Sequence, residues 1–117
     1  MPKHHLSCHC GAVSFDVDVE IKGLGVCNCS MCGRAGMLML FVPRDAVENL
    51  TGEDNLTDYQ FGQKRLHHPF CSTCGVRTIG WGKDSKGNDS CVINARCIEG
   101  IDVHTLEIEH RFDGKSL

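Results

Sequence analysis

The sequence predicts a mainly β fold, and three features of the 117-residue chain support this prediction. In residues Gly11–Glu20 apolar and polar side chains alternate, which is typical of a strand with one buried face. Residues Met37–Val42 are six consecutive apolar residues that end at Pro43, which favours a buried strand over a helix. Gly, Pro, Asn and Asp recur at short intervals elsewhere, as in turns between strands. The length suits one domain spanning residues 1–117.

The remaining elements follow from the same signals. Further strands are predicted over residues 56–61, 64–70, 76–81 and 90–96. The first two would be joined by a turn at Gly62-Gln63, and the polar residues 82–89 are expected to form a loop. Asp102 is placed to cap one short helical turn. Phe41 and Trp81 are expected to lie in the core.

Composition and charge exclude several classes of protein. The formal net charge is −3 and no basic stripe is present, so we expect no nucleic-acid binding. No run of about 18 apolar residues exists, so no membrane span is expected. The N-terminal residues lack the apolar segment of a secretory signal. We therefore expect a soluble, cytoplasmic protein.

The nine cysteines point to metal rather than to disulfides. Their number is odd and no secretory signal precedes them, conditions that do not favour a disulfide framework. Seven of them form local groups: Cys8-His9-Cys10, Cys27-Asn28-Cys29-Ser30-Met31-Cys32 and Cys71-Ser72-Thr73-Cys74. Alternate residues of an extended segment, or the two ends of a C-x-x-C turn, can present both thiols to one ion. Zinc is the usual occupant of such sites in cytosolic proteins.

Seven thiolates do not divide into sites of four, so two unequal zinc sites per chain are expected. Spacing alone does not determine which groups combine. The most economical solution is a closed, structural zinc site made of Cys8, Cys10, Cys71 and Cys74. The second zinc site then consists of Cys27, Cys29 and Cys32. It either keeps one position open for water or a thiol, or is closed by Cys91, Cys97 or a histidine.

The three cysteine groups also carry a family resemblance. The segments Cys8-His9-Cys10-Gly11, Cys27-Asn28-Cys29-Ser30-Met31-Cys32 and Phe70-Cys71-Ser72-Thr73-Cys74-Gly75 resemble the glutathione-dependent formaldehyde-activating enzyme family, which includes centromere protein V. Leu50-Thr51-Gly52-Glu53-Asp54 and Asn94-Ala95-Arg96-Cys97 agree with it, so the resemblance covers nearly the whole chain.

This resemblance implies an Mss4-like fold, with β-sheets built around a structural zinc. It assigns the structural site to Cys8, Cys10, Cys71 and Cys74, and a catalytic zinc to Cys27, Cys29 and Cys32. It also implies a carbon–sulfur lyase that joins formaldehyde to glutathione, giving S-hydroxymethylglutathione. The alternative hypothesis is a non-catalytic, zinc-stabilised binding module of the same fold.

Three polar residues are further candidates for this site. His67 or His68 would reach the second zinc or carry a proton, the alternative being that both are exposed strand ends. Arg34 would pair with a glutathione carboxylate, the alternative being a solvated side chain.

Overall fold

The computed structural model describes residues 3–61, 66–84 and 86–114, and it confirms the predicted mainly β class. The strands in these residues are β1 (Lys3–Ser7), β2 (Ser14–Asp18), β3 (Gly25–Cys27), β4 (Met39–Pro43), β5 (Val47–Thr51), β6 (Leu56–Thr57), β7 (Leu66–His67), β8 (Phe70–Cys71), β9 (Ile79–Lys83), β10 (Asp89–Asn94) and β11 (His110–Phe112). The helical elements are α1 (Ser30–Ala35) and 3₁₀ turns at Arg44–Ala46, Glu53–Asn55, Ala95–Cys97 and Val103–Thr105.

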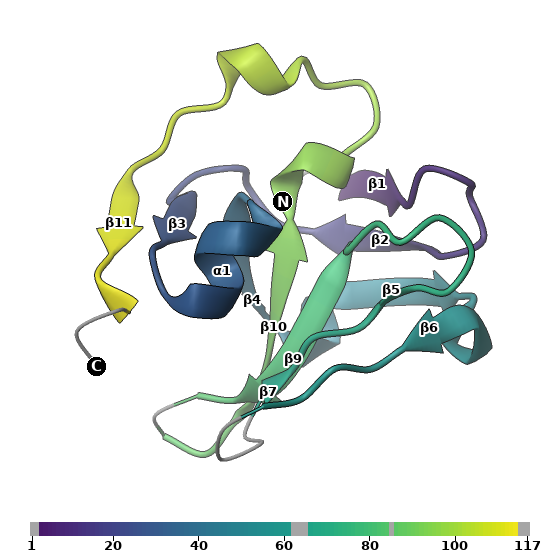
Figure 1. Cartoon of the computed structure of the whole chain (residues 1–117). Coiled ribbons are helices and arrows are strands. Elements are labelled where there is room, and N and C mark those ends of the chain that lie inside the picture. The colour runs from purple at the N-terminus through teal and green to yellow at the C-terminus, as the bar shows by residue number, and fades with distance from the viewer. Residues whose placement is uncertain (1–2, 62–65, 85, 115–117) are drawn as a thin grey trace.

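Two sheets dominate the architecture (Figure 1). The smaller is antiparallel, with three strands in the order β1-β2-β5. The larger has six strands in the order β11-β3-β4-β10-β9-β7, and only the β11–β3 pair within it is parallel. β6 and β8 form a separate short pair. Figure 1 shows the segment after β10 arching over the top of the molecule before β11 reaches β3 at the far edge of the larger sheet.

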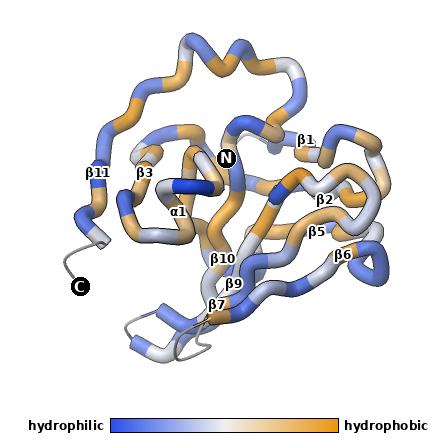
Figure 2. The backbone as a smooth tube through the Cα atoms, in the orientation of Figure 1, coloured by the Kyte–Doolittle hydropathy of each residue, from blue (hydrophilic) through white to orange (hydrophobic). Residues whose placement is uncertain are grey.

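The core lies between the apolar faces of these sheets. Phe15 and Val17 of β2 are fully buried, as the alternating pattern predicts. They belong to the same cluster as Leu40 and Val42 of β4 and Ile93 of β10. Burying side chains of this size contributes roughly 1.5–3 kcal/mol each. Figure 2 shows hydrophobic residues along the central strands, whereas the C-terminal arch alternates in character.

Several predicted elements are confirmed with shifted boundaries. The predicted strands at 11–20, 37–42, 76–81 and 90–96 correspond to β2, β4, β9 and β10. The Asp102 side chain accepts a hydrogen bond from the His104 N–H at 3.0 Å and caps the 3₁₀ turn that follows, as predicted.

The predicted strands at 56–61 and 64–70 are wrong in extent. β6 ends at Thr57, although Tyr59 and His68 still exchange two backbone hydrogen bonds. The second prediction splits at the buried Pro69, which has no N–H for a ladder: β7 pairs with β9 in the larger sheet, whereas β8 pairs with β6. The predicted Gly62-Gln63 turn and residues 64–65 lie outside the described residues.

Two further expectations are corrected. Residues 82–83 and 89 belong to β9 and β10, so the expected loop is a tighter turn in which the Asp84 carboxylate accepts from the Lys86 and Asn88 N–H groups. Phe41, expected in the core, is 56% exposed, because its side chain points to the face of β4 opposite to the one on which Leu40 and Val42 are buried.

Within the described ranges, no helix has the length and apolar character required to cross a bilayer.

Candidate metal centres

Cys8, Cys10, Cys71 and Cys74 come together at the end of the molecule where the smaller sheet meets the β6–β8 pair. Their sulfur atoms all lie within 4.8 Å of one another. We call this group the four-cysteine centre. It joins two segments separated by some sixty residues, and its Cys8 and Cys71 are buried in a small cluster with Val13.

Local backbone geometry points these thiols inward. After β1 the chain turns back at Gly11, which has a φ of +82°, and the Cys8 N–H donates to the Val13 carbonyl at 3.0 Å. After β8 a similar knuckle forms, in which the Gly75 N–H donates to the Cys71 carbonyl at 2.8 Å. Gly75 has a φ of +80°, a conformation that glycine adopts without steric cost.

The donor set fits a zinc ion. A tetrahedral zinc with bonds of about 2.3 Å separates its sulfur ligands by about 3.8 Å. The Cys8–Cys10 and Cys10–Cys71 sulfur separations are 3.7 and 3.6 Å, whereas a disulfide bond is about 2.0 Å long. All nine cysteines are free thiols.

Hydrogen bonds favour the thiolate form of two of these ligands, Cys71 and Cys74. Backbone N–H groups of Cys10 and Val76 lower the pKa of the Cys74 thiol to about 6. The Cys74 N–H lowers the pKa of Cys71, whose sulfur also accepts from the Asn55 side chain at 3.4 Å. Metal binding requires deprotonated cysteines, so this environment suits a metal ligand.

Cys27, Cys29 and Cys32 form a second group, which we call the three-cysteine centre. Their sulfur atoms also lie within 4.8 Å of one another, and all three residues are half-buried. Regular structure positions all three: Cys27 ends β3, Cys29 is the N-cap of α1, and Cys32 lies in its first turn. The Cys32 N–H donates to the Cys29 sulfur at 3.2 Å, as a helix N-terminus does to its cap.

Opposing effects act on the thiols of this centre. Burial acts to raise the pKa of Cys29, but the N–H groups of Cys32 and Met31 outweigh it and the pKa is lowered. Burial, together with the neighbouring Cys29, raises the pKa of Cys32 to about 12. Three thiols that share so small a volume give up their protons together only when a cation compensates their charge.

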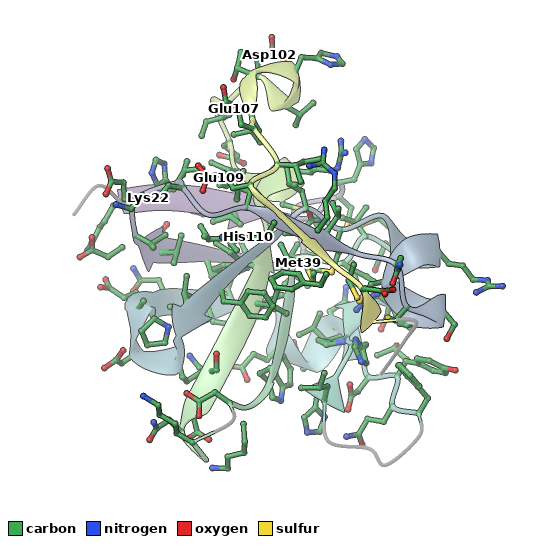
Figure 3. The ribbon with its side chains drawn as sticks, turned by 90° about the vertical axis from the view of Figure 1, so that its left-hand side faces the viewer. Lys22, Met39, Asp102, Glu107, Glu109 and His110 are labelled. Atoms are coloured by element: carbon green, nitrogen blue, oxygen red, sulfur yellow. The ribbon has the colours of Figure 1, made fainter. Side chains whose placement is uncertain are left out.

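The C-terminal segment forms one wall of the three-cysteine centre. β11 pairs with β3, and the Asn28 N–H donates to the Phe112 carbonyl at 3.2 Å. The Asn28 side chain donates to the Asp113 carboxylate at 2.8 Å. Gly114 then lies against the sulfur of Cys27. In Figure 3 this segment, marked by Glu109 and His110, runs across the face of the molecule beside β3.

The other candidate ligands lie elsewhere. Cys91 is buried in the main core. The thiol of Cys97 donates to the Arg77 carbonyl at 3.7 Å, and burial, together with the charges of Cys8 and Cys74, raises its pKa to about 11. Within the described part of the chain, no fourth His, Cys, Asp or Glu joins the three-cysteine centre.

The polar candidates have other partners. His67 Nδ1 lies 2.6 Å from the Asp58 carboxylate, and its ring stacks on Trp81. His68 Nδ1 accepts from Arg77 at 2.9 Å. Arg34 donates to the Ser30 carbonyl of its own helix. His67 lines a cavity of about 420 Å³, and a second cavity of about 840 Å³ lies beside Phe41; no clustered cysteine lines either cavity.

Sequence reasoning did not identify Asn28, Arg77, Asp113 or Gly114 as part of this region. The position of Asn28 between Cys27 and Cys29 is the one sequence feature that could have identified it. The other three are distant in sequence or lie in a segment without periodicity, so no local pattern indicated them.

Comparison with known proteins agrees with this fold. A crystal structure of a Rhodobacter sphaeroides protein is similar to this chain, with a TM-score of 0.80 and 30% sequence identity, covering 92% of this chain and 98% of the other. The family model described as glutathione-dependent formaldehyde-activating enzyme matches residues 3–111, which include all seven clustered cysteines. The chain therefore belongs to the glutathione-dependent formaldehyde-activating enzyme family.

Proposed function

We propose that this protein is a zinc-dependent carbon–sulfur lyase that forms or breaks a glutathione–aldehyde adduct of the S-hydroxymethylglutathione type. The observation that carries the proposal is the three-cysteine centre. Its three thiols converge while no fourth ligand among the described residues completes the set. A zinc site with three protein ligands keeps a position for a substrate, whereas structural sites are closed.

In this proposal the four-cysteine centre holds a structural zinc and the protein binds two zinc ions per chain. Binding of a structural zinc contributes roughly 10–16 kcal/mol, which is comparable to the whole stability of a typical domain at about 5–15 kcal/mol. The four-cysteine centre joins β1 to the β6–β8 pair, so its metal is a condition for folding.

The addition reaction needs no oxidant or reductant. The thiol sulfur forms a bond to the aldehyde carbon, and the S–H proton moves to the aldehyde oxygen. A zinc ion held by Cys27, Cys29 and Cys32 would favour the thiolate form of an incoming thiol at neutral pH. The chain itself orients the ligands: α1 directs its N–H groups at Cys29, and Asn28 and Asp113 hold the segment between Cys27 and Cys29 in place.

Adduct formation tests the proposal directly. Formaldehyde and glutathione are mixed in water, and their equilibration is followed by NMR exchange spectroscopy with zinc-loaded protein, with the Cys29→Ser variant, and without protein. We expect acceleration by the wild type and a background rate with Cys29→Ser. If wild-type protein that carries both metals leaves the rate of adduct formation at its background value, the proposed activity is refuted. That result would favour the non-catalytic, zinc-stabilised binding module and leave the family and fold unchanged.

A further inference from the structure

The cavity of about 420 Å³ that His67 lines is separate from both metal centres. It lies between β9 of the larger sheet and the end of β5 in the smaller one, and residues of both strands line it. None of the seven clustered cysteines contributes to its lining. Its volume falls within the range of about 300–1,000 Å³ that is typical of small-molecule sites.

Part of the cavity lining is apolar. Ile79 is buried, whereas Leu50 and Trp81 are half-buried and leave apolar surface open to the cavity. Ile79 and Trp81 are alternate residues of β9, so their side chains point to the same face of the sheet. An apolar group that entered the cavity would remove this surface from water, which is favourable.

His67 forms another part of the lining, and two contacts hold its ring. Nδ1 lies 2.6 Å from the Asp58 carboxylate, and the ring stacks on Trp81 with the centroids 5.5 Å apart. Asp58 also accepts from the His68 N–H at 3.1 Å, which holds the carboxylate in place. Because a carboxylate only accepts, Nδ1 carries the proton, and Nε2 of the neutral ring is an acceptor. No group among the described residues bonds to this Nε2 atom.

The charged side chains of the lining are only partly paired. Lys83 Nζ lies 2.6 Å from the Asp89 carboxylate, so these two compensate each other. Arg44 and Glu53 also line the cavity, and within the described ranges neither side chain forms an ion pair or a hydrogen bond. One guanidinium and one carboxylate therefore remain available to a ligand.

A ligand with both a carboxylate and an ammonium group matches this lining. A guanidinium such as that of Arg44 binds a carboxylate through two parallel N–H···O bonds. An ammonium group has only donors, and the Glu53 carboxylate and His67 Nε2 are acceptors for it. A simple anion would be repelled by Glu53 and a simple cation by Arg44, so a zwitterion suits both charges.

We propose that this cavity binds a free α-amino acid with an apolar side chain. Arg44 holds its carboxylate, Glu53 and His67 hold its ammonium group, and its side chain packs on Trp81. The inference goes beyond the proposed function and does not depend on it, because no cysteine of either metal centre takes part.

Trp81 is the only tryptophan of the chain, so its fluorescence reports on the cavity without a label. Zinc-loaded wild type is titrated with L-phenylalanine, with 3-phenylpropionate, which lacks the ammonium group, and with phenethylamine, which lacks the carboxylate. We expect a saturable change with L-phenylalanine and about 10- to 100-fold weaker binding of each analogue, as for loss of hydrogen bonds to a charged group. No saturable change with L-phenylalanine would overturn the inference, and so would equal affinities for the three ligands.

Variants assign the two ends of the ligand. Arg44→Met should weaken L-phenylalanine and 3-phenylpropionate by about 10- to 100-fold and leave phenethylamine unchanged. Glu53→Gln should weaken only the two ligands that carry an ammonium group. A purely structural role of either residue would weaken all three ligands alike, and that result would contradict the assignment.

Two control variants complete the test. Arg34→Met removes an exposed arginine in α1, away from the cavity, and should bind L-phenylalanine as wild type does. Cys29→Ser, which disrupts the three-cysteine centre, should also bind it with unchanged affinity. Loss of binding in Cys29→Ser would place the amino acid at the second metal instead of in this cavity, and the inference would fail while the proposed function stood.

Discussion

Gly114 lies so close to Cys27 that a Cβ atom at position 114 would come within 2.6 Å of the Cys27 sulfur and 3.0 Å of the Cys29 Cβ. These residues come from distant parts of the chain, and the parallel pairing of β11 with β3 brings them together. Asn28 strengthens the contact through hydrogen bonds to Phe112 and Asp113. The C-terminal strand is thus a wall of the three-cysteine centre as well as an edge of the sheet.

Gly114→Ala should therefore weaken the second metal site. The new methyl group must displace either the Cys27 sulfur or the strand that carries it. We expect a loss of about tenfold or more in second-site zinc affinity, measured by chelator competition, with the first site unchanged. Gly33→Ala in α1 is the matched control, because its Cβ would meet only the Asn28 backbone, at an ordinary 3.6 Å or more. Equal affinities for the two variants would contradict the assigned contact.

Serine substitutions should separate the two centres. Cys71 is fully buried in the four-cysteine centre, so Cys71→Ser should lose cooperative folding, followed by circular dichroism. Cys32→Ser, in the half-buried three-cysteine centre, should remain folded and lose one zinc per chain, counted by native mass spectrometry. A folded Cys71→Ser variant that retains both metals would refute the structural assignment.

Gly52 should tolerate no side chain. A Cβ at this position would lie 1.9 Å from the Ala12 carbonyl oxygen, on the turn that presents Cys8 and Cys10. Gly87 shares its φ of +83° but has open space around it, so it isolates the steric effect. We expect Gly87→Ala to cost about 1–2 kcal/mol from its backbone conformation, and Gly52→Ala to cost more by roughly 1–3 kcal/mol. Urea unfolding of the zinc-loaded variants measures both losses of stability. Similar unfolding midpoints for the two variants would contradict the close approach of Gly52 to the Ala12 carbonyl.

Asn94 should be needed for stability, because its buried side chain forms hydrogen bonds with three backbone groups. It donates to the Arg77 carbonyl and accepts from the N–H groups of Leu38 and Arg96. Asn94→Ala should cost about 1–3 kcal/mol for each buried group left unpaired. The exposed Asn88→Ala, on the turn after β9, should change the free energy of unfolding by less than about 0.5 kcal/mol. Thermal unfolding distinguishes them, and an unperturbed Asn94→Ala would show that water replaces these bonds.

The predictable elements were those whose pattern is local. β2 followed from its alternation, and β4 from its apolar run. β3 and β11 were not predicted, because each has three residues and β11 is exposed throughout. Such short strands exist only because a partner strand supplies their hydrogen bonds.

For the three-cysteine centre, the sequence itself indicated which thiols can reach one ion, because separations of two or three residues keep Cys27, Cys29 and Cys32 close together. Tertiary structure alone decided what surrounds them. The packing of β11 against β3 placed Gly114 on Cys27. Contacts between distant segments depend on how sheets pair, and neither composition nor spacing encodes that pairing locally.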